Sequence, residues 1–324
     1  VAVGASGCLA LVELARHLLF ARSVCPARLS VRFESGISAK TATRGRLYVE
    51  ARLPMERSTG VVPMGLMDGK RGIIFGVANE RSYAYFIAQQ LVAHGAQCAF
   101  AYLPMGKMEH RVKKATEKLG IDKPWLEACD ANSDESLDQI FSKLQADFGT
   151  IDFVAHSIAF ADRDYLKPDR FHETPRQVYL DAIDTSAYTL LAMAQRAMNL
   201  MSNGGSIVNM SYFGGEKVTP GYNVMGVAKA ALEHTTRYLA YELGDKNRNI
   251  RVNCISAGPF KTLAGAGVGG MDEMIAHQQR KASLKRANTG EEVGDTAVYL
   301  LSDLSTGVTG ETIHVDCGFS IVGL

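Results

Sequence analysis

The chain has 324 residues, a formal net charge of +1 and 47% hydrophobic residues. This length suits one large α/β domain with an appendage, and the composition is ordinary for a packed protein. A net charge near zero gives no support for nucleic-acid binding. No apolar run reaches the ~18 residues of a membrane span, so we expect a soluble protein without membrane partners.

The six cysteines contain no C-x-x-C pair and stand mostly within apolar runs. This pattern favours buried reduced thiols over disulfides or a metal site. Because reduced thiols suit a reducing compartment, we expect a cytoplasmic location.

Residues 1–63 differ in charge from the rest of the chain. They hold nine Lys+Arg and four Asp+Glu, a net charge of +5, whereas the remainder holds 26 and 30, a net charge of −4. A possible amphipathic helix around Leu9–Phe20 precedes an Arg- and Ser-rich stretch. Arginine, serine and few acids are typical of an organelle transit peptide, but the four glutamates argue against one. We predict that residues 1–63 are an extension, either poorly ordered or a start-site artefact.

A strand, a tight loop and a helix follow from Arg71. The run GIIFGV is short and rich in β-branched residues, ANERS is polar, and Tyr83–His94 has helical spacing. Gly76 allows a close turn, and Ser82 can cap the helix, whose free N–H groups would meet a pyrophosphate. The unit predicts phosphate binding, although G-x-G-x-x-G is absent.

The next two strands bear on the choice of cofactor. QCAFAY ends at Leu103 with no acid for a ribose hydroxyl and no adjacent arginine for a 2′-phosphate. The absence of a basic cluster disfavours a nucleotide with a 2′-phosphate, while Lys107 keeps one possible. LEACD predicts a third strand ending at Asp130, a loop aspartate that can cap the following helix.

Further strand and helix patterns continue to the end of the chain. IDFVAHSIAF predicts a fourth strand, Pro175–Met201 has helical spacing, and GGSIVNMS, IRVNCISAGPF and ETIHVDCGFSI predict three more strands. The Met and Leu stripe of the helical stretch indicates core or a subunit interface. His156 in the fourth strand is interpreted as a hydrogen-bonded structural residue and not as an acid.

The stretch GYNVMGVAKA places a tyrosine and a lysine on one helix face. Tyr222 and Lys229 are seven residues apart, which is two helical turns. Tyr212 follows the apolar run GGSIVNMS, at the carboxyl edge where open α/β sheets bind ligands. Such pairs are also common on ordinary amphipathic helices, so the wider segment has to decide their meaning.

The wider segment SYFGGEKVTPGYNVMGVAKAALE resembles the active site of bacterial NADH-dependent enoyl-[acyl-carrier-protein] reductases of the short-chain dehydrogenase/reductase superfamily. The order Tyr-x9-Tyr-x6-Lys, the HSI triplet and the AGP triplet are theirs, and MGLMDGKRG resembles their amino terminus. The resemblance covers 64–324. It implies one NAD-binding domain, a single Rossmann-like doubly wound parallel sheet flanked by helices.

Ordinary members of that superfamily carry Ser-x12-Tyr-x3-Lys. Counting back from Lys229 places Met225 at their tyrosine and Tyr212 at their serine. Methionine cannot exchange a proton, so alcohol/ketone chemistry lacks its acid, whereas Tyr222 can reach a carbonyl oxygen. This favours a reductase of conjugated double bonds.

The resemblance implies roles for particular residues. Tyr222 would stabilise the enolate oxygen, Lys229 would bind the nicotinamide ribose, and Tyr212 would shape the acyl pocket. Reduction of enoyl-acyl-carrier-protein substrates in type II fatty acid biosynthesis by a homotetramer is implied as well. The implied cofactor-binding residues are Gly76, Ala78, Ser82, Tyr83, Asp130, Ala131, Ser157, Ile158, Lys229, Phe260 and Thr262.

The chain departs from these relatives at several positions. Phe86, Ala159 and Cys317 stand where glycine is usual, and Phe86 raises the question of how closely its helix approaches the sheet. The glycine-rich stretch AGPFKTLAGAGVGG, with four glycines from Gly265 to Gly270, resembles a substrate-binding lid, alternatively a plain connection.

The charges after that loop also differ from those of many relatives. Asp272 and Glu273 follow it, and positive charge returns at Arg280 and Lys281. If this charge governs docking of an acidic carrier protein, reversing it would strengthen docking; otherwise the acids only favour a helix start.

Three other functions stay open. A ketoacyl reductase is disfavoured by Met225. A dinucleotide sensor without catalysis would keep GVANERS but would not need Tyr222 and Lys229, and a scaffold would need neither.

Overall fold

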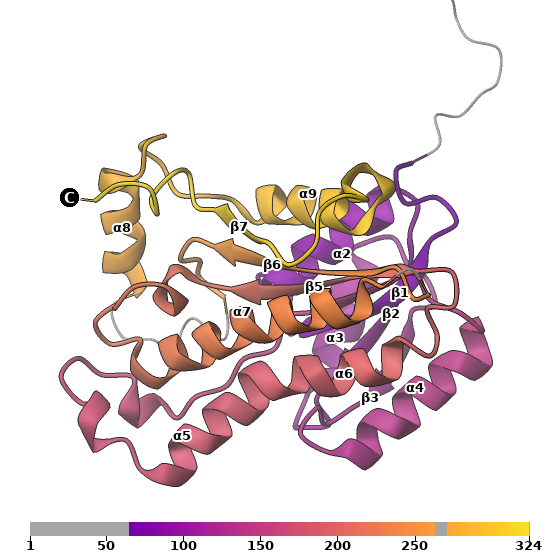
Figure 1. Cartoon of the computed structure of the whole chain (residues 1–324), viewed down its shortest axis with the longest axis horizontal. Coiled ribbons are helices and arrows are strands. Elements are labelled where there is room, and N and C mark those ends of the chain that lie inside the picture. The colour runs from indigo at the N-terminus through magenta and orange to yellow at the C-terminus, as the bar shows by residue number, and fades with distance from the viewer. Residues whose placement is uncertain (1–64, 246, 263–270, 324) are drawn as a thin grey trace, which may run out of the picture. The chain divides into compact units, whose positions relative to one another are not determined.

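The structure, a computed structural model, describes residues 65–245, 247–262 and 271–323. These residues form a parallel sheet of seven strands in the order β3-β2-β1-β4-β5-β6-β7, with helices on both faces (Figure 1). This confirms the predicted Rossmann-like doubly wound sheet. The strands are β1 (Arg71–Phe75), β2 (Gln97–Tyr102), β3 (Trp125–Ala128), β4 (Phe153–His156), β5 (Gly205–Ser211), β6 (Ile250–Ala257) and β7 (Thr312–Val315).

Eight α-helices lie in the described residues. They are α2 (Tyr83–Ala93), α3 (Met108–Glu117), α4 (Asp134–Phe148), α5 (Arg176–Ile183), α6 (Thr189–Ala197), α7 (Asn223–Leu243), α8 (Met271–Lys281) and α9 (Gly290–Leu301). In the part of the chain so described, no helix has the length and apolarity to cross a membrane. The expected helix around Leu9–Phe20 and residues 263–270 of the expected lid lie outside the described residues.

Two apolar cores cover the two faces of the sheet. Ile74 packs in a cluster with α2 and α9, whereas its neighbours Ile73 and Phe75 pack in the other cluster with α4, α6 and α7. Successive strand residues point to opposite faces, and here both faces are buried. This is why the strands read as continuous apolar runs in the sequence.

The predicted helical stretch over Pro175–Met201 is helical from Arg176 to Ala197. A π turn, η4 (Asp184–Tyr188), lies within it between α5 and α6. Within the turn, the Ser186 hydroxyl accepts a hydrogen bond from the backbone N–H of Phe160 (3.0 Å) and donates one to the carbonyl of the same residue (3.1 Å). The widened turn thus binds the backbone of the segment that follows β4.

The strand order sets the position of the candidate site. β1 lies between β2 and β4, so the chain reverses its direction of winding there. Ligands of open α/β sheets bind outside the carboxyl ends of the strands at this reversal. Figure 1 shows α8 standing beyond the carboxyl ends of β5 and β6.

Four cysteines of the described residues, Cys98, Cys129, Cys254 and Cys317, are free thiols. Burial raises the pKa of Cys98 and of Cys254 to about 12 and that of Cys129 to about 11. These buried thiols therefore stay protonated and unreactive at neutral pH.

Candidate active site

Tyr212 and Tyr222 form an edge-to-face pair at the end of β5. Tyr212 follows the strand and Tyr222 directly precedes α7, and their ring centroids are 4.8 Å apart at an interplanar angle of 68°. Gly214 lies against this pair, because a Cβ atom there would be 2.4 Å from Cδ1 of Tyr222. A side chain at Gly214 would therefore displace the Tyr222 ring.

Both tyrosine hydroxyls are protonated at neutral pH. Burial raises the pKa of Tyr212 to about 12, although a hydrogen bond with Thr219 opposes the rise. Burial raises the pKa of Tyr222 even further, with smaller contributions from Tyr212 and Glu233. Each hydroxyl is thus available as a hydrogen-bond donor.

Lys229 is buried two turns into α7, with a relative exposure of 5%. Its ammonium donates a hydrogen bond to the carbonyl oxygen of Met210 at 2.7 Å. Burial lowers the pKa of Lys229 to about 8, although Cys254 and Glu233 act to raise it. The amine therefore titrates close to neutral pH.

Glu233 lies one turn beyond Lys229 and is also buried. Ser211 donates a hydrogen bond from Oγ to Oε1 of Glu233 at 2.5 Å, and burial raises the pKa of that carboxyl. A Cβ atom at Gly215 would be 2.8 Å from the same oxygen. The spacing of four residues from Lys229 was a signal for this carboxylate that the sequence interpretation did not use.

His156 is fully buried and lies outside the cavity lining. Its Nε2 is 2.8 Å from Oγ1 of Thr189, and its Nδ1 has no hydrogen-bond partner in the described residues. Burial, with the charge of Lys229, lowers the pKa of His156 to about 3. A neutral, hydrogen-bonded histidine agrees with the structural interpretation.

The loop after β1 closely approaches the end of β4. Gly76 has a φ of +100°, and a Cβ atom there would be 2.1 Å from the carbonyl oxygen of Ser157. Only glycine combines this conformation with this approach. Ser82 caps α2 as predicted, because its hydroxyl accepts the N–H of Tyr85 at 3.3 Å. This cap satisfies the N–H of Tyr85 and fixes where α2 begins.

Phe86 does not hold α2 away from the sheet. Its ring lies edge-on to Phe260, with centroids 5.7 Å apart, and it covers Gly290 of α9, where a Cβ atom would be 2.2 Å from Cδ2 of Phe86. Ile87 and Leu91 of α2 are fully buried in the core beneath. Gly290 on α9 therefore leaves room for the ring of Phe86, which stands where relatives usually have glycine.

Cys317 adopts a φ of 59°, a conformation that glycine prefers. The Asp316 carboxylate accepts the N–H groups of Gly318 at 2.9 Å and Ser320 at 2.8 Å, and it holds this turn. This positive φ explains why relatives usually carry glycine at the position of Cys317.

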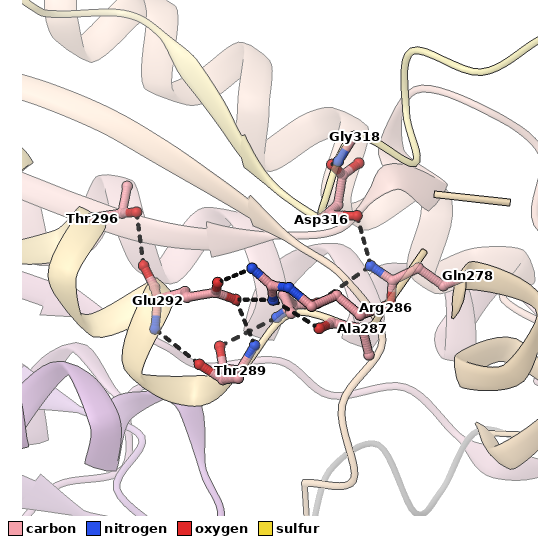
Figure 2. Close-up of polar contacts among 9 residues, drawn as sticks. Gln278, Arg286, Ala287, Thr289, Glu292, Thr296, Asp316 and Gly318 are labelled. Carbon is pink, nitrogen blue, oxygen red and sulfur yellow. Dashed lines mark hydrogen bonds and ion pairs between the residues drawn. The ribbon is translucent and has the colours of Figure 1, made fainter. Parts of the chain in front are cut away.

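Polar contacts tie α8 to the body of the domain (Figure 2). Gln278 of α8 donates to the carbonyl oxygen of Asp316 at 2.9 Å, and Arg286 forms two hydrogen bonds with Glu292 at the start of α9. Gln278 also reaches Asn288, whose amide donates to the Tyr83 hydroxyl at 3.0 Å. The carboxyl-terminal part of α8 is thereby connected to the predicted cofactor end of the site.

All predicted site residues line one cavity of about 910 Å³. They are Gly76, Ala78, Ser82, Tyr83, Asp130, Ala131, Ser157, Ile158, Tyr212, Tyr222, Lys229, Phe260 and Thr262. Ala159 and Met225 line the same cavity. The sequence interpretation missed Arg163, Met271 and Met274, which also line it and come from loop and helix segments without a motif.

The acids that follow the loop stand in the first turn of α8. Lys261, which precedes the loop, pairs with Asp272 at 2.5 Å. The acidic start of α8 is therefore partly neutralised by a lysine next to Phe260. Glu273 remains an exposed acid in the first turn.

Known proteins resemble this chain over most of its length. A family model described as Enoyl-(Acyl carrier protein) reductase matches residues 76–320. The enoyl-[acyl-carrier-protein] reductase [NADH] 1 of Rhizobium meliloti (strain 1021) is 48% identical over 260 residues, covering 80% of this chain and 93% of that protein.

Two solved structures are similar as well. The Anaplasma phagocytophilum reductase in complex with NAD is 45% identical with a TM-score of 0.76, covering 80% of this chain and 97% of that one. The Bacillus cereus reductase with NADP+ and indole naphthyridinone is 46% identical with a TM-score of 0.77, covering 81% of this chain and 100% of that one. By sequence, by fold and by its tyrosine and lysine residues at one cavity, the chain belongs to the enoyl-(acyl carrier protein) reductase family.

Proposed function

We propose that the protein reduces the trans-2 double bond of enoyl-acyl-carrier-protein thioesters with NADH, in the elongation cycle of type II fatty acid biosynthesis. The observation that carries this proposal is the identity of the proton donor at the cavity wall. Tyr222 lines the cavity, and Met225, one turn further along α7, lines it too. A thioether has no proton to give, so the substrate oxygen has Tyr222 as its donor.

The cavity fits a dinucleotide. Gly76 brings the backbone close to β4, and the free N–H groups at the start of α2 suit a pyrophosphate. Asp130 and Ala131 after β3 would face adenine, and Ser157 after β4 would face the nicotinamide ribose. When bound, NADH supplies a hydride to the β-carbon of the enoyl thioester.

Tyr222 stabilises the negative charge that develops on the thioester oxygen. Its hydroxyl keeps its proton because burial raises its pKa. A donor held in a buried wall is already oriented when that charge appears, which is the basis of electrostatic catalysis. Tyr212, packed edge-to-face on the same ring, fixes its orientation and shapes the acyl pocket.

Lys229 holds the ribose hydroxyls and supplies positive charge beneath them. The hydrogen bond to the Met210 carbonyl orients the ammonium, which has further donors free for a ligand. With a pKa of about 8, Lys229 can also pass a proton toward Tyr222 after each turnover.

NADH is favoured over NADPH by the end of β2. The lining there consists of Tyr102, Leu103 and Met108, which carry no positive charge. A 2′-phosphate is normally met by an arginine or lysine at this place. Lys107 is outside the described cavity lining.

The proposal is tested by following NADH and NADPH oxidation separately with an enoyl-acyl-carrier-protein substrate. We expect turnover with NADH and a much lower kcat/KM with NADPH. Cofactor binding without turnover would indicate a dinucleotide sensor, and failure to bind either cofactor would indicate a scaffold.

The proposed assembly is a homotetramer. Tyr238 and Tyr241 of α7 are 62% and 85% exposed, and Leu180 of the neighbouring α5 is 50% exposed. Exposed apolar groups of this size on adjacent helices support a contact between subunits. Light scattering should give four chains per particle, and Tyr241→Lys should reduce that number.

We also propose a cytoplasmic location, which the free buried thiols support. Cell fractionation with antibody detection tests it, and recovery outside the cytoplasmic fraction would contradict it.

A further inference from the structure

Arg163 lies at the rim of the cavity on the substrate side. It begins the short 3₁₀ turn η2 (Arg163–Tyr165), it is exposed, and it lines the cavity. The residues that flank it, Ala161 and Leu166, pack in the apolar cluster that contains Met225 and touches Tyr222. The turn is therefore part of the wall that carries the proposed proton donor.

Hydrogen bonds from one side chain add to this packing and join the turn to the start of α7. The Asn223 amide donates hydrogen bonds to the carbonyl oxygens of Tyr165 and Lys167, both at 2.7 Å. Asn223 is the first residue of α7 and directly follows Tyr222. Arg163 is thus placed on a segment that is fastened to the catalytic helix.

Neither acid next to Arg163 pairs with its guanidinium, although Asp162 also lines the cavity. Asp162 accepts the backbone N–H of Asp164 at 2.9 Å and caps the turn, while Asp164 pairs with Lys167 at 3.1 Å. Arg170 pairs with Glu173 at 2.6 Å. The guanidinium of Arg163 has no hydrogen bond or ion pair among the described residues.

The other positive charges near the cavity are buried or paired. Among the described lining residues, only Arg163 and Lys229 are cationic, and Lys229 is buried and bonded to Met210. Lys261 on the α8 side is paired with Asp272. An anionic group at the cavity rim, on the wall that carries Tyr222, would therefore lie next to the unpaired guanidinium of Arg163.

We propose that Arg163 binds the phosphate of the substrate's phosphopantetheine arm. This inference rests on the proposed function, because an enoyl thioester placed at Tyr222 extends its pantetheine arm outward to a phosphate. Guanidinium groups bind phosphate through paired, charge-assisted hydrogen bonds. The cofactor pyrophosphate has a separate place, the N-terminus of α2. Carrier protein and coenzyme A both present such a phosphate.

The test compares Arg163→Ala with the wild type on four thioesters of one enoyl chain: pantetheine, phosphopantetheine, coenzyme A and acyl carrier protein. We expect KM for the phosphopantetheine thioester to rise about tenfold. KM for the pantetheine thioester, kcat and KM for NADH should stay unchanged. Arg163→Lys should recover part of the affinity, and the difference should shrink as salt is raised.

Arg176→Ala is the matched control. It removes an exposed arginine at the start of α5 that does not line the cavity, and it should leave all these constants unchanged. If KM rises for the phosphopantetheine and carrier-protein thioesters, the carrier protein is a source of the bound phosphate. If KM rises for the phosphopantetheine and coenzyme A thioesters, coenzyme A is a source.

Three results would overturn the assignment. One is an equal rise for pantetheine and phosphopantetheine thioesters, another is no rise for any phosphorylated thioester, and the third is a rise in KM for NADH alone. If the wild-type protein reduces none of the four thioesters, the proposed function itself is rejected.

Discussion

Lys229 donates a hydrogen bond to the carbonyl oxygen of Met210, 2.7 Å away, and so joins α7 to the end of β5. Tyr212 and Tyr222 stand at the same junction with ring centroids 4.8 Å apart. The donor hydroxyl and the ammonium are therefore held by strand and helix backbone and not by a loose loop.

Tyr222→Phe should lower kcat by about 10²–10³-fold, because it removes one donor to the developing oxyanion and keeps the ring. The affinity for NADH should be unchanged, since Tyr222 is not assigned to the cofactor. Steady-state rates on a short enoyl thioester and NADH titrations measure both quantities. Wild-type turnover in this variant would remove Tyr222 from the mechanism.

The affinity for NADH should depend on pH through Lys229, whose pKa burial lowers to about 8. Below that pH the amine is charged and binds the ribose strongly, and above it the neutral amine binds less well. Affinity should therefore fall as pH rises through about 8. Lys229→Met should bind more weakly at every pH and show a flat profile. Parallel profiles for the two proteins would contradict the role.

Glu233→Gln should move this alkaline loss of affinity to lower pH. The Glu233 carboxylate acts to raise the pKa of Lys229, and its removal lets that pKa fall. The amide oxygen can still accept the Ser211 hydrogen bond.

The matched control is Glu216→Gln. Glu216 is a partly exposed carboxylate paired with His314 at 2.7 Å. Its replacement should leave the pH dependence of NADH affinity unchanged. The charged and titratable groups that face Glu233 are Glu216, Arg237 and His314. An unshifted profile in Glu233→Gln would show that this carboxylate does not act on Lys229.

Gly214→Ala should reduce kcat about 10²-fold, because misplacing a catalytic group by about 1 Å has effects of that size. The new Cβ atom would be 2.4 Å from Cδ1 of Tyr222 and would shift that ring. Gly307→Ala is the control, since nothing lies within 4 Å of a Cβ atom there. Full activity of Gly214→Ala would show that the tyrosine tolerates displacement.

A chain that begins at Met64 should fold and keep its activity. The charge break between residues 1–63 and the rest motivates this expectation, as does the similarity of MGLMDGKRG to a family amino terminus. Thermal melting and turnover measure the outcome. An insoluble or inactive product would show that residues 1–63 are required.

Much of the fold and site could be predicted because local rules decided them. The strand around QCAFAY was found at Gln97–Tyr102 because strands buried on both faces form apolar runs. The seven-residue spacing of Tyr222 and Lys229 brought both residues to one cavity because two helical turns restore the same face.

Other features depend on contacts between distant segments. The π turn at Asp184–Tyr188 is related to a hydrogen bond with Phe160, which no periodicity in its own helix encodes. The placement of Arg163 depends on the Asn223 amide, 60 residues further along the chain. Such features require the folded chain.

The most direct test of the central claim offers the wild-type protein a mixture of trans-2-enoyl and 3-ketoacyl thioesters of the same carrier with limiting NADH. Mass spectrometry then measures which substrate is consumed. With Tyr222 as the donor and Met225 in place of a second acid, we predict that the saturated acyl thioester accumulates and the ketoacyl thioester remains. Conversion of the ketoacyl thioester to the 3-hydroxyacyl product, with the enoyl thioester untouched, would contradict the account.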